Sequence, residues 1–223
     1  MPMGKTAKLA EPERLVIYGV DWTGYLRFLR AFRDRRGYRL TYDRGVLEIM
    51  NVTFGHERYA YLLGRMVVVL TEELLLPIAS GGSTTFKRRK KQRGLEPDNC
   101  YWITNEHRVR GKERIDLRTD PAPDLAIEVD VTRSSLNRLG IYATLNVPEV
   151  WRYRDGMVSF HVLAVNQKYV QQPISLSFPG LAAAEITRFV GSLHLTEENT
   201  LIREFRDWVR QQFAAGVLTQ PTP

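Results

Sequence analysis

The chain has 223 residues, of which 43% are hydrophobic and 26% charged, with a formal net charge of +7. This composition fits one globular domain with a buried core. The single cysteine, Cys100, excludes an intrachain disulfide and a four-cysteine zinc site. The positive charge favours a nucleic acid, an anionic membrane or an acidic protein as partner.

No segment of the sequence looks like an export signal or a membrane span. Residues 1–11 are polar and lack the apolar stretch of a signal peptide. The longest apolar run, over residues 66–76, is interrupted by Thr71-Glu72-Glu73 and is too short to cross a bilayer. We therefore expect a cytoplasmic protein with no membrane partner. We also expect one domain over residues 12–215, with flexible termini at 1–11 and 218–223.

Helix and strand patterns alternate along the N-terminal half. Asp21 is placed to cap a helix with an apolar face, and Gly37 is placed to end it. Asp43-Arg44-Gly45 is typical of a hairpin turn between two alternating strands. The elements expected after that helix, in order, are strands at 38–42 and 46–50, a long helix at 57–76, and short strands at 78–80 and 84–86.

The C-terminal half continues the alternation after a long polar loop over residues 105–123. Ser134-Ser135 can cap one helix, and Thr196 can cap a final amphipathic helix. The elements expected here are strands at 99–104, 125–131, 147–153 and 157–162, a helix ending near 145, and the final helix. Strands flanked by helices predict an α/β fold with a central mixed sheet covered by helices.

The strand expected at 125–131 carries carboxylates that packing does not explain. Glu128 and Asp130 are two residues apart and so point to one face, which Asp124 shares. Asp98 begins the preceding strand and would lie beside Glu128 if the two strands pair. Burying such acids without partners is costly, and hard cations such as Mg²⁺ take oxygen ligands. The alternative is an edge strand with a solvated face and no chemical role.

These residues, taken with others in order, resemble a known family. The matching segments are Leu47-Glu48-Ile49-Met50, His56-Glu57, Gly82-Ser83-Thr84-Thr85, Glu96-Pro97-Asp98, Pro123-Asp124-Leu125-Ala126-Ile127-Glu128-Val129, Tyr142 and Asn146-Val147-Pro148-Glu149-Val150-Trp151. Together they resemble the Uma-type restriction endonucleases of the PD-(D/E)XK nuclease superfamily. The resemblance runs from about residue 42 to residue 153.

The resemblance implies a restriction-endonuclease-like fold and a metal-dependent endonuclease that cuts DNA. Asp98 and Glu128 would be the two halves of the acidic motif and would bind Mg²⁺, with Mn²⁺ as a substitute. Asp124 would be a further ligand or orienting group. Glu48 would be the acidic residue of the early hairpin, near the metal.

One position departs from the superfamily pattern, because Asp130 stands where the motif has lysine. The resemblance implies that the basic group has moved to the following helix, where Arg138 stands four residues before Tyr142. An arginine there can hold a phosphate, but it stays protonated and cannot act as a general base. Lys87 and Lys90 are alternative cations that the spacing does not place.

The densest charge run, Lys87-Arg88-Arg89-Lys90-Lys91, is a candidate nucleic-acid contact. The alternative is a solvated loop. For His56, capping or packing at the start of the long helix is a simpler role than metal binding or catalysis.

Three functions remain open from the sequence. The first is a DNA endonuclease, for which cutting both strands would favour a homodimer. The second is a nucleic-acid-binding module of the same fold that does not cut. The third is an interaction protein whose basic surface meets an acidic partner.

Overall fold

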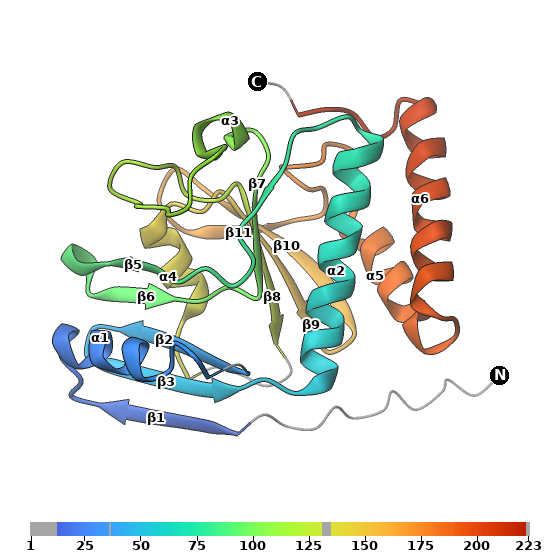
Figure 1. Ribbon diagram of the computed structural model, residues 1–223. Coiled ribbons are helices and arrows are strands. Elements are labelled where there is room, and N and C mark those ends of the chain that lie inside the picture. Colours follow the sequence, from blue (N-terminus) through green and yellow to red (C-terminus); the bar gives the residue numbers. More distant parts are fainter. Residues whose placement is uncertain (1–12, 36, 131–134, 222–223) are drawn as a thin grey trace.

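The computed structural model describes residues 13–35, 37–130 and 135–221 (Figure 1). Its first elements are β1 (Arg14–Tyr18), α1 (Trp22–Ala31), β2 (Tyr38–Asp43), β3 (Val46–Asn51), α2 (Phe54–Glu73), β4 (Ala79–Ser80), β5 (Phe86–Arg88), the 3₁₀ turn η1 (Arg89–Lys91), β6 (Arg93–Leu95) and β7 (Asn99–Trp102). The remaining elements are α3 (Glu106–Val109), β8 (Leu125–Asp130), α4 (Arg138–Leu145), β9 (Glu149–Arg154), β10 (Met157–Leu163), β11 (Tyr169–Gln172), α5 (Ala183–Gly191), the 3₁₀ turn η2 (Ser192–His194) and α6 (Glu198–Ala214).

The strands form two sheets. The larger has the order β11-β10-β9-β8-β7-β4, and the smaller has the order β1-β3-β2-β6-β5. In the larger sheet β8 and β9 are parallel and the other pairs are antiparallel, so it is the mixed sheet that the sequence predicted. The α/β, restriction-endonuclease-like fold class is therefore confirmed. The expected N-terminal hairpin belongs instead to a sheet of its own, because β1 and β6 join it on its two sides.

Local signals set several boundaries. The Asp21 side chain accepts a hydrogen bond from Gly24 N at 2.7 Å and begins α1, as predicted. The helix ends at Ala31, earlier than Gly37, and a turn leads into β2. The hairpin turn between β2 and β3 is confirmed: Arg44 and Gly45 both have positive φ, 46° and 94°, the geometry of a tight hairpin.

Three further helices begin at residues other than those expected. The Thr53 side chain accepts a hydrogen bond from His56 N, so α2 begins at Phe54. Glu197 rather than Thr196 caps α6. Asn137 caps α4, whereas Ser134 lies outside the described residues.

The larger sheet separates two cores. Leu125, Ile127 and Val129 of β8 face α2, α5 and α6, which cover one side (Figure 1). Ala126 of β8 faces the other side, where it packs with Ile141 and other residues of α4. The alternation along β8 therefore gives one face to a continuous apolar core and turns the other face toward α4.

The chain end after α6 packs against the fold. Leu218 is buried, Thr219 N donates to Pro179 O, and Gln220 Nε2 donates to Leu74 O at 2.8 Å. The expected flexible tail therefore does not begin at 218, whereas residues 1–11 lie outside the described part of the chain. Among the described helices, none is long and apolar enough to cross a membrane.

Arginines of α6 fix this helix to the end of α2. Arg206 and Arg210 both contact the Glu73 carboxylate, at 2.5 and 2.7 Å. The hydrogen bond from Arg210 is the main cause that lowers the pKa of Glu73, against burial, which raises it. Because the folded-state pKa is lowered, these contacts stabilise the fold above the ordinary pKa of 4.5, and the gain is lost as pH falls.

We predict that Glu73→Gln lowers the free energy of unfolding by about 1 kcal/mol at pH 7, because it removes the charge that two arginines share. The difference from the unmodified protein should shrink below pH 4.5, as urea unfolding at several pH values would measure. Glu72→Gln is the matched control, since Glu72 is 53% exposed and contacts Arg206 alone of the two arginines. An equal loss at acid pH would contradict the ionic explanation.

Candidate functional site

The segment Glu96-Pro97-Asp98 is the crossing between the two sheets. It leaves β6 of the smaller sheet and enters β7 of the larger one. The Glu96 carboxylate anchors the crossing, because it accepts hydrogen bonds from Thr85 Oγ1 at 2.8 Å and from Leu40 N at 3.2 Å. The crossing therefore holds Asp98 at the junction of the sheets.

Asp98 is buried, and several donors surround its carboxylate. Val129 N donates to Oδ2 at 2.8 Å, and His56 Nε2 lies 3.1 Å from the same oxygen. Arg39 Nε lies 3.6 Å from Oδ1. Burial raises the pKa of Asp98, but the charges of His56 and Arg138 outweigh it, and the net pKa is lowered. Asp98 is therefore an anion at neutral pH.

Glu128 lies on the strand next to Asp98 and is bound on both oxygens by α4. Arg138 Nε donates to Oε2 at 2.8 Å and Nη2 donates to Oε1 at 2.7 Å. The Tyr142 hydroxyl also donates to Oε1. Arg138 and Tyr142 are four residues apart, so one face of α4 presents both. Burial raises the pKa of Glu128 to about 7, with the Asp98 charge adding to it and Arg138 opposing it.

The two motif carboxylates thus share one electrostatic environment. The Asp98 charge acts on Glu128, and Arg138 acts on both acids. In the antiparallel pairing of β7 with β8, Asn99 lies opposite Ile127, which puts the preceding residue, Asp98, at the level of Glu128. The two acids therefore lie at the same level on neighbouring strands.

Arg138 also links the site to the smaller sheet. Its Nη2 donates to Glu96 O at 2.8 Å, and its Nη1 contacts Thr41 Oγ1 on β2. Thr41 lies opposite Glu48 in the hairpin register. Glu48 is buried and accepts hydrogen bonds from Ser135 N and Oγ at 2.9 and 2.6 Å, and Arg14 Nε lies 3.3 Å from it. The hairpin acid therefore lies at the rim of the site.

The other two acids of β8 have separate partners. Asp130 is paired with Arg152 of β9, and both line a cavity of about 210 Å³ together with Glu128 and Arg138. Glu128 and Asp130 therefore share a face, as expected. Asp124 stands at the opposite end of the strand, and its contacts, described next, are not with the site.

Asp124 braces the loop that follows β7. Its Oδ2 accepts hydrogen bonds from Ile103 N at 2.7 Å and Asn105 N at 3.0 Å, and its Oδ1 accepts one from Asn105 Nδ2 at 2.6 Å. These bonds favour a structural role over the metal-binding role that the family resemblance suggested.

The sequence did not predict that His56 and Arg39 would contact Asp98. His56 is buried and faces Asp98, and burial lowers its pKa, but the Asp98 charge outweighs this and raises it to about 10. Arg39 lies on β2, with a side chain 13% exposed. An arginine on a strand and a histidine in the first turn of a helix are common at protein surfaces, so the sequence alone does not place them at the site. Their contacts with Asp98 arise because β2 and α2 both meet the crossing.

The basic run divides between the interior and the surface. Arg88 points inward and donates to Thr144 O at 3.2 Å and to Leu117 O at 3.3 Å. Lys87, Arg89, Lys90 and Lys91 are exposed. The whole run lines a cavity of about 960 Å³ with Arg114 and Arg118. Four of the five predicted nucleic-acid contacts are thus available at the surface.

A mixed sheet with two acids on neighbouring strands at its junction with a hairpin defines the restriction-endonuclease-like class of nuclease folds. The chain belongs to the Uma2 family, described as "Putative restriction endonuclease", whose model matches residues 22–198. A comparison with curated proteins finds no match to this chain.

Donor chemistry decides whether these residues fit a metal ion. Asp98, Glu128 and Glu48 offer carboxylate oxygens, the ligands that Mg²⁺ prefers. Within the described residues, no three His, Cys, Asp or Glu side chains are arranged to hold a metal ion. Asp98 and Glu128 therefore have the ligand type that Mg²⁺ prefers. In this structure, however, the Arg138 guanidinium binds both oxygens of Glu128.

We predict that Arg138→Met lowers the free energy of unfolding by about 3–5 kcal/mol, because it leaves Glu128 buried without its countercharge. Chemical denaturation at pH 8 would measure this. Arg203→Met, at a side chain that is 68% exposed on α6, is the matched control and should change stability little. A small change in both variants would contradict the role of Arg138 as the partner of Glu128.

For Asp124 we predict a loss of stability of about 2–3 kcal/mol on substitution by alanine, because buried donors of the 103–105 loop lose a charged acceptor. Thermal unfolding beside the surface control Asp207→Ala measures it. If Asp124→Ala kept its stability and instead lost affinity for Mn²⁺, the bracing role would be wrong.

Proposed function

We propose that this protein is a metal-dependent endonuclease that hydrolyses phosphodiester bonds of DNA. The observation that carries the proposal is the meeting of two buried, electrostatically linked carboxylates, Asp98 and Glu128, at the junction of the two sheets. Two acids on neighbouring strands offer the carboxylate oxygens that a hard cation takes as ligands, which supports the proposal.

Asp98 and Glu128 would hold Mg²⁺, with Mn²⁺ as a substitute, and Glu48 would be a further ligand. When bound, the ion would neutralise charge on the phosphodiester and lower the pKa of the attacking water. For Glu128 to become a ligand, Arg138 must release at least one of the two oxygens that it holds. The released guanidinium would then be placed to bind a phosphate oxygen.

The protein groups around Glu128 are proton donors. The charge of Glu128 raises the pKa of Arg138 against burial, so the guanidinium stays protonated. Burial, and then the charge of Glu128, raise the pKa of the Tyr142 hydroxyl. Neither side chain can take a proton from water at neutral pH. Arg138 and Tyr142 therefore orient Glu128 and stabilise negative charge.

The exposed cations of the basic run would hold the DNA backbone. Lys87, Arg89, Lys90 and Lys91 lie on β5 and η1, directly before β6 and the crossing to Asp98. These cations would neutralise phosphates of the DNA backbone. Cutting both strands would need a second copy of the chain, so a homodimer stays a prediction, as does a cytoplasmic location.

We predict that Asp98→Asn and Glu128→Gln each reduce Mg²⁺-dependent cleavage by about 100-fold or more, because each removes one charged oxygen ligand while keeping the side-chain shape. Plasmid and oligonucleotide cleavage with Mg²⁺ or Mn²⁺ would measure this, with circular dichroism to confirm folding. Glu185→Gln, at a carboxylate on α5 paired with Arg188, is the control. Cleavage by the two site variants at the rate of the unmodified protein would refute the assignment.

A second candidate rests on the closed Arg138–Glu128 pair. If the guanidinium never releases Glu128, the chain would be a module that binds nucleic acid through its basic surface without cutting it. Salt-dependent binding with no cleavage, on single-stranded and duplex substrates with either ion, would favour this candidate. Cleavage that disappears in Glu128→Gln would exclude it.

A further inference from the structure

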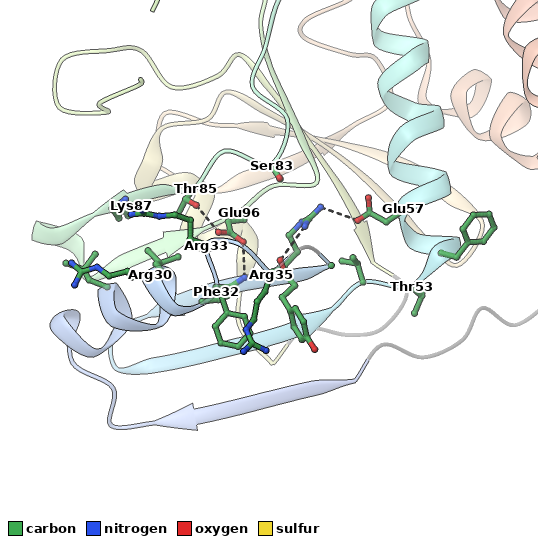
Figure 2. A pocket seen from close by; sticks show the side chains of 18 residues that line it. Arg30, Phe32, Arg33, Arg35, Thr53, Glu57, Ser83, Thr85, Lys87 and Glu96 are labelled. Carbon is green, nitrogen blue, oxygen red and sulfur yellow. Dashed lines mark hydrogen bonds and ion pairs between the residues drawn. The ribbon is translucent and has the colours of Figure 1, made fainter. Parts of the chain in front are cut away.

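A second cavity, next to the one that the basic run lines, opens beside the crossing. It has a volume of about 890 Å³ and lies between α1, β2, the start of α2 and the β5–β6 hairpin (Figure 2). Its walls carry arginines and aromatic rings in alternation. We call it the α1 groove and define it by Arg30, Phe32, Arg33, Tyr38, Arg39 and Phe54.

Cations outnumber acids in the lining. The cations are Arg30, Arg33, Arg35, Arg39 and Lys87, and the acids are Glu57 and Glu96. Both acids already have partners: Glu96 binds Thr85 and Leu40 N, and Glu57 lies 3.2 Å from Arg39 (Figure 2). Arg30, Arg33, Arg35 and Lys87 are exposed. The groove therefore presents a positive surface that suits a chain of phosphates.

Three aromatic side chains line the same groove. Phe54 is 83% exposed and Tyr38 is 40% exposed, so both rings are open to solvent. Phe32 meets Tyr38 edge-on, with centroids 5.3 Å apart, and the Arg35 guanidinium lies 5.9 Å from the Phe32 centroid. Rings interleaved with guanidinium groups form a platform on which nucleobases can stack.

The groove leads to the candidate active site through Arg39. This residue lines the groove, and its Nε is also 3.6 Å from Asp98 Oδ1. Among the described residues, this buried Nε has no hydrogen-bond partner. Thr85 and Lys87 belong both to this groove and to the cavity of the basic run, so the two positive surfaces are continuous.

We propose that the α1 groove binds an unpaired DNA strand and guides it past Arg39 to Asp98. Arginines would hold successive phosphates while Phe54 and Tyr38 stack on bases. In a duplex the faces of the bases are already stacked on each other, so exposed rings would gain nothing from it. The proposal extends the nuclease function above by naming its substrate, a single-stranded region of DNA.

Binding can be tested without cleavage. The full chain is titrated into fluorescently labelled single-stranded oligothymidine, and into a duplex of equal length, in the presence of a chelator, and anisotropy gives Kd. We expect tighter binding of the single strand. Phe54→Ala should weaken it about 5-fold or more, the lower end of the loss for one stacked base. Tyr61→Ala is the matched control, because Tyr61 is 62% exposed on α2 and does not line the groove.

The charge of the groove is tested on a single helix. Arg30→Ala should weaken binding and reduce the dependence of log Kd on log salt by about 0.7, the value for one phosphate contact on a single strand. Arg27→Ala, also an exposed arginine of α1 but outside the lining, should do neither.

The outcomes separate the two proposals. Tighter binding of duplex, or equal losses in Phe54→Ala and Tyr61→Ala, would overturn the groove assignment even if the protein cuts DNA. Groove-dependent binding of single strands with no cleavage under any metal condition would overturn the nuclease function and leave the groove assignment standing.

Discussion

The ion pair between Arg138 and Glu128 stands where the larger and the smaller sheet meet, and Arg138 links the two sheets. One guanidinium reaches the mixed sheet through Glu128, the crossing through Glu96 O, and the smaller sheet through Thr41. An arginine is suited to this because its donors are fixed in a plane and it stays charged when buried. The proposed site therefore depends on whether the Arg138 guanidinium holds Glu128 or releases it to a metal ion.

The position of the pair explains why the superfamily lysine can be absent. Asp130, which stands at the lysine position, forms an ion pair with Arg152 of the neighbouring strand. The cation is supplied from α4 instead, whose first turn reaches over β8. In this chain the cation at Glu128 is therefore a guanidinium from the helix and not an amine from the strand. A guanidinium can bind a phosphate, but it stays protonated and cannot accept a proton from water.

The sequence predicted those parts of the fold that depend on local chemistry. The Asp21 cap, the turn at Arg44-Gly45 and the alternation of β8 were readable because each follows from one or two residues. The strands that the sequence did not predict depend on partners far away in the chain. β6 has three residues and β11 has four, and both are strands because a neighbouring strand supplies their hydrogen bonds.

The candidate site shows the same division. Asp98 and Glu128 were identifiable from their motif, whereas Asp124 looked equivalent to Glu128 because the spacing predicted both on one face of one strand. In the structure β8 begins after Asp124, at Leu125. Their environments differ: the loop at 103–105 surrounds Asp124 with donors, and α4 brings cations to Glu128. His56 and Arg39 could not be weighed from spacing, since their approach to Asp98 requires α2, β2 and the crossing to meet.

The alternating faces of β8 leave this strand without tolerance for a change of length. Leu125, Ile127 and Val129 fill the layer beneath α2, and Glu128 occupies the opposite side. Deleting a single residue inside the strand would exchange the sides, sending a carboxylate into the hydrocarbon interior and an aliphatic chain toward Arg138. An insertion or deletion among the six residues of β8 would therefore cost the protein its core packing and its acidic site in a single step.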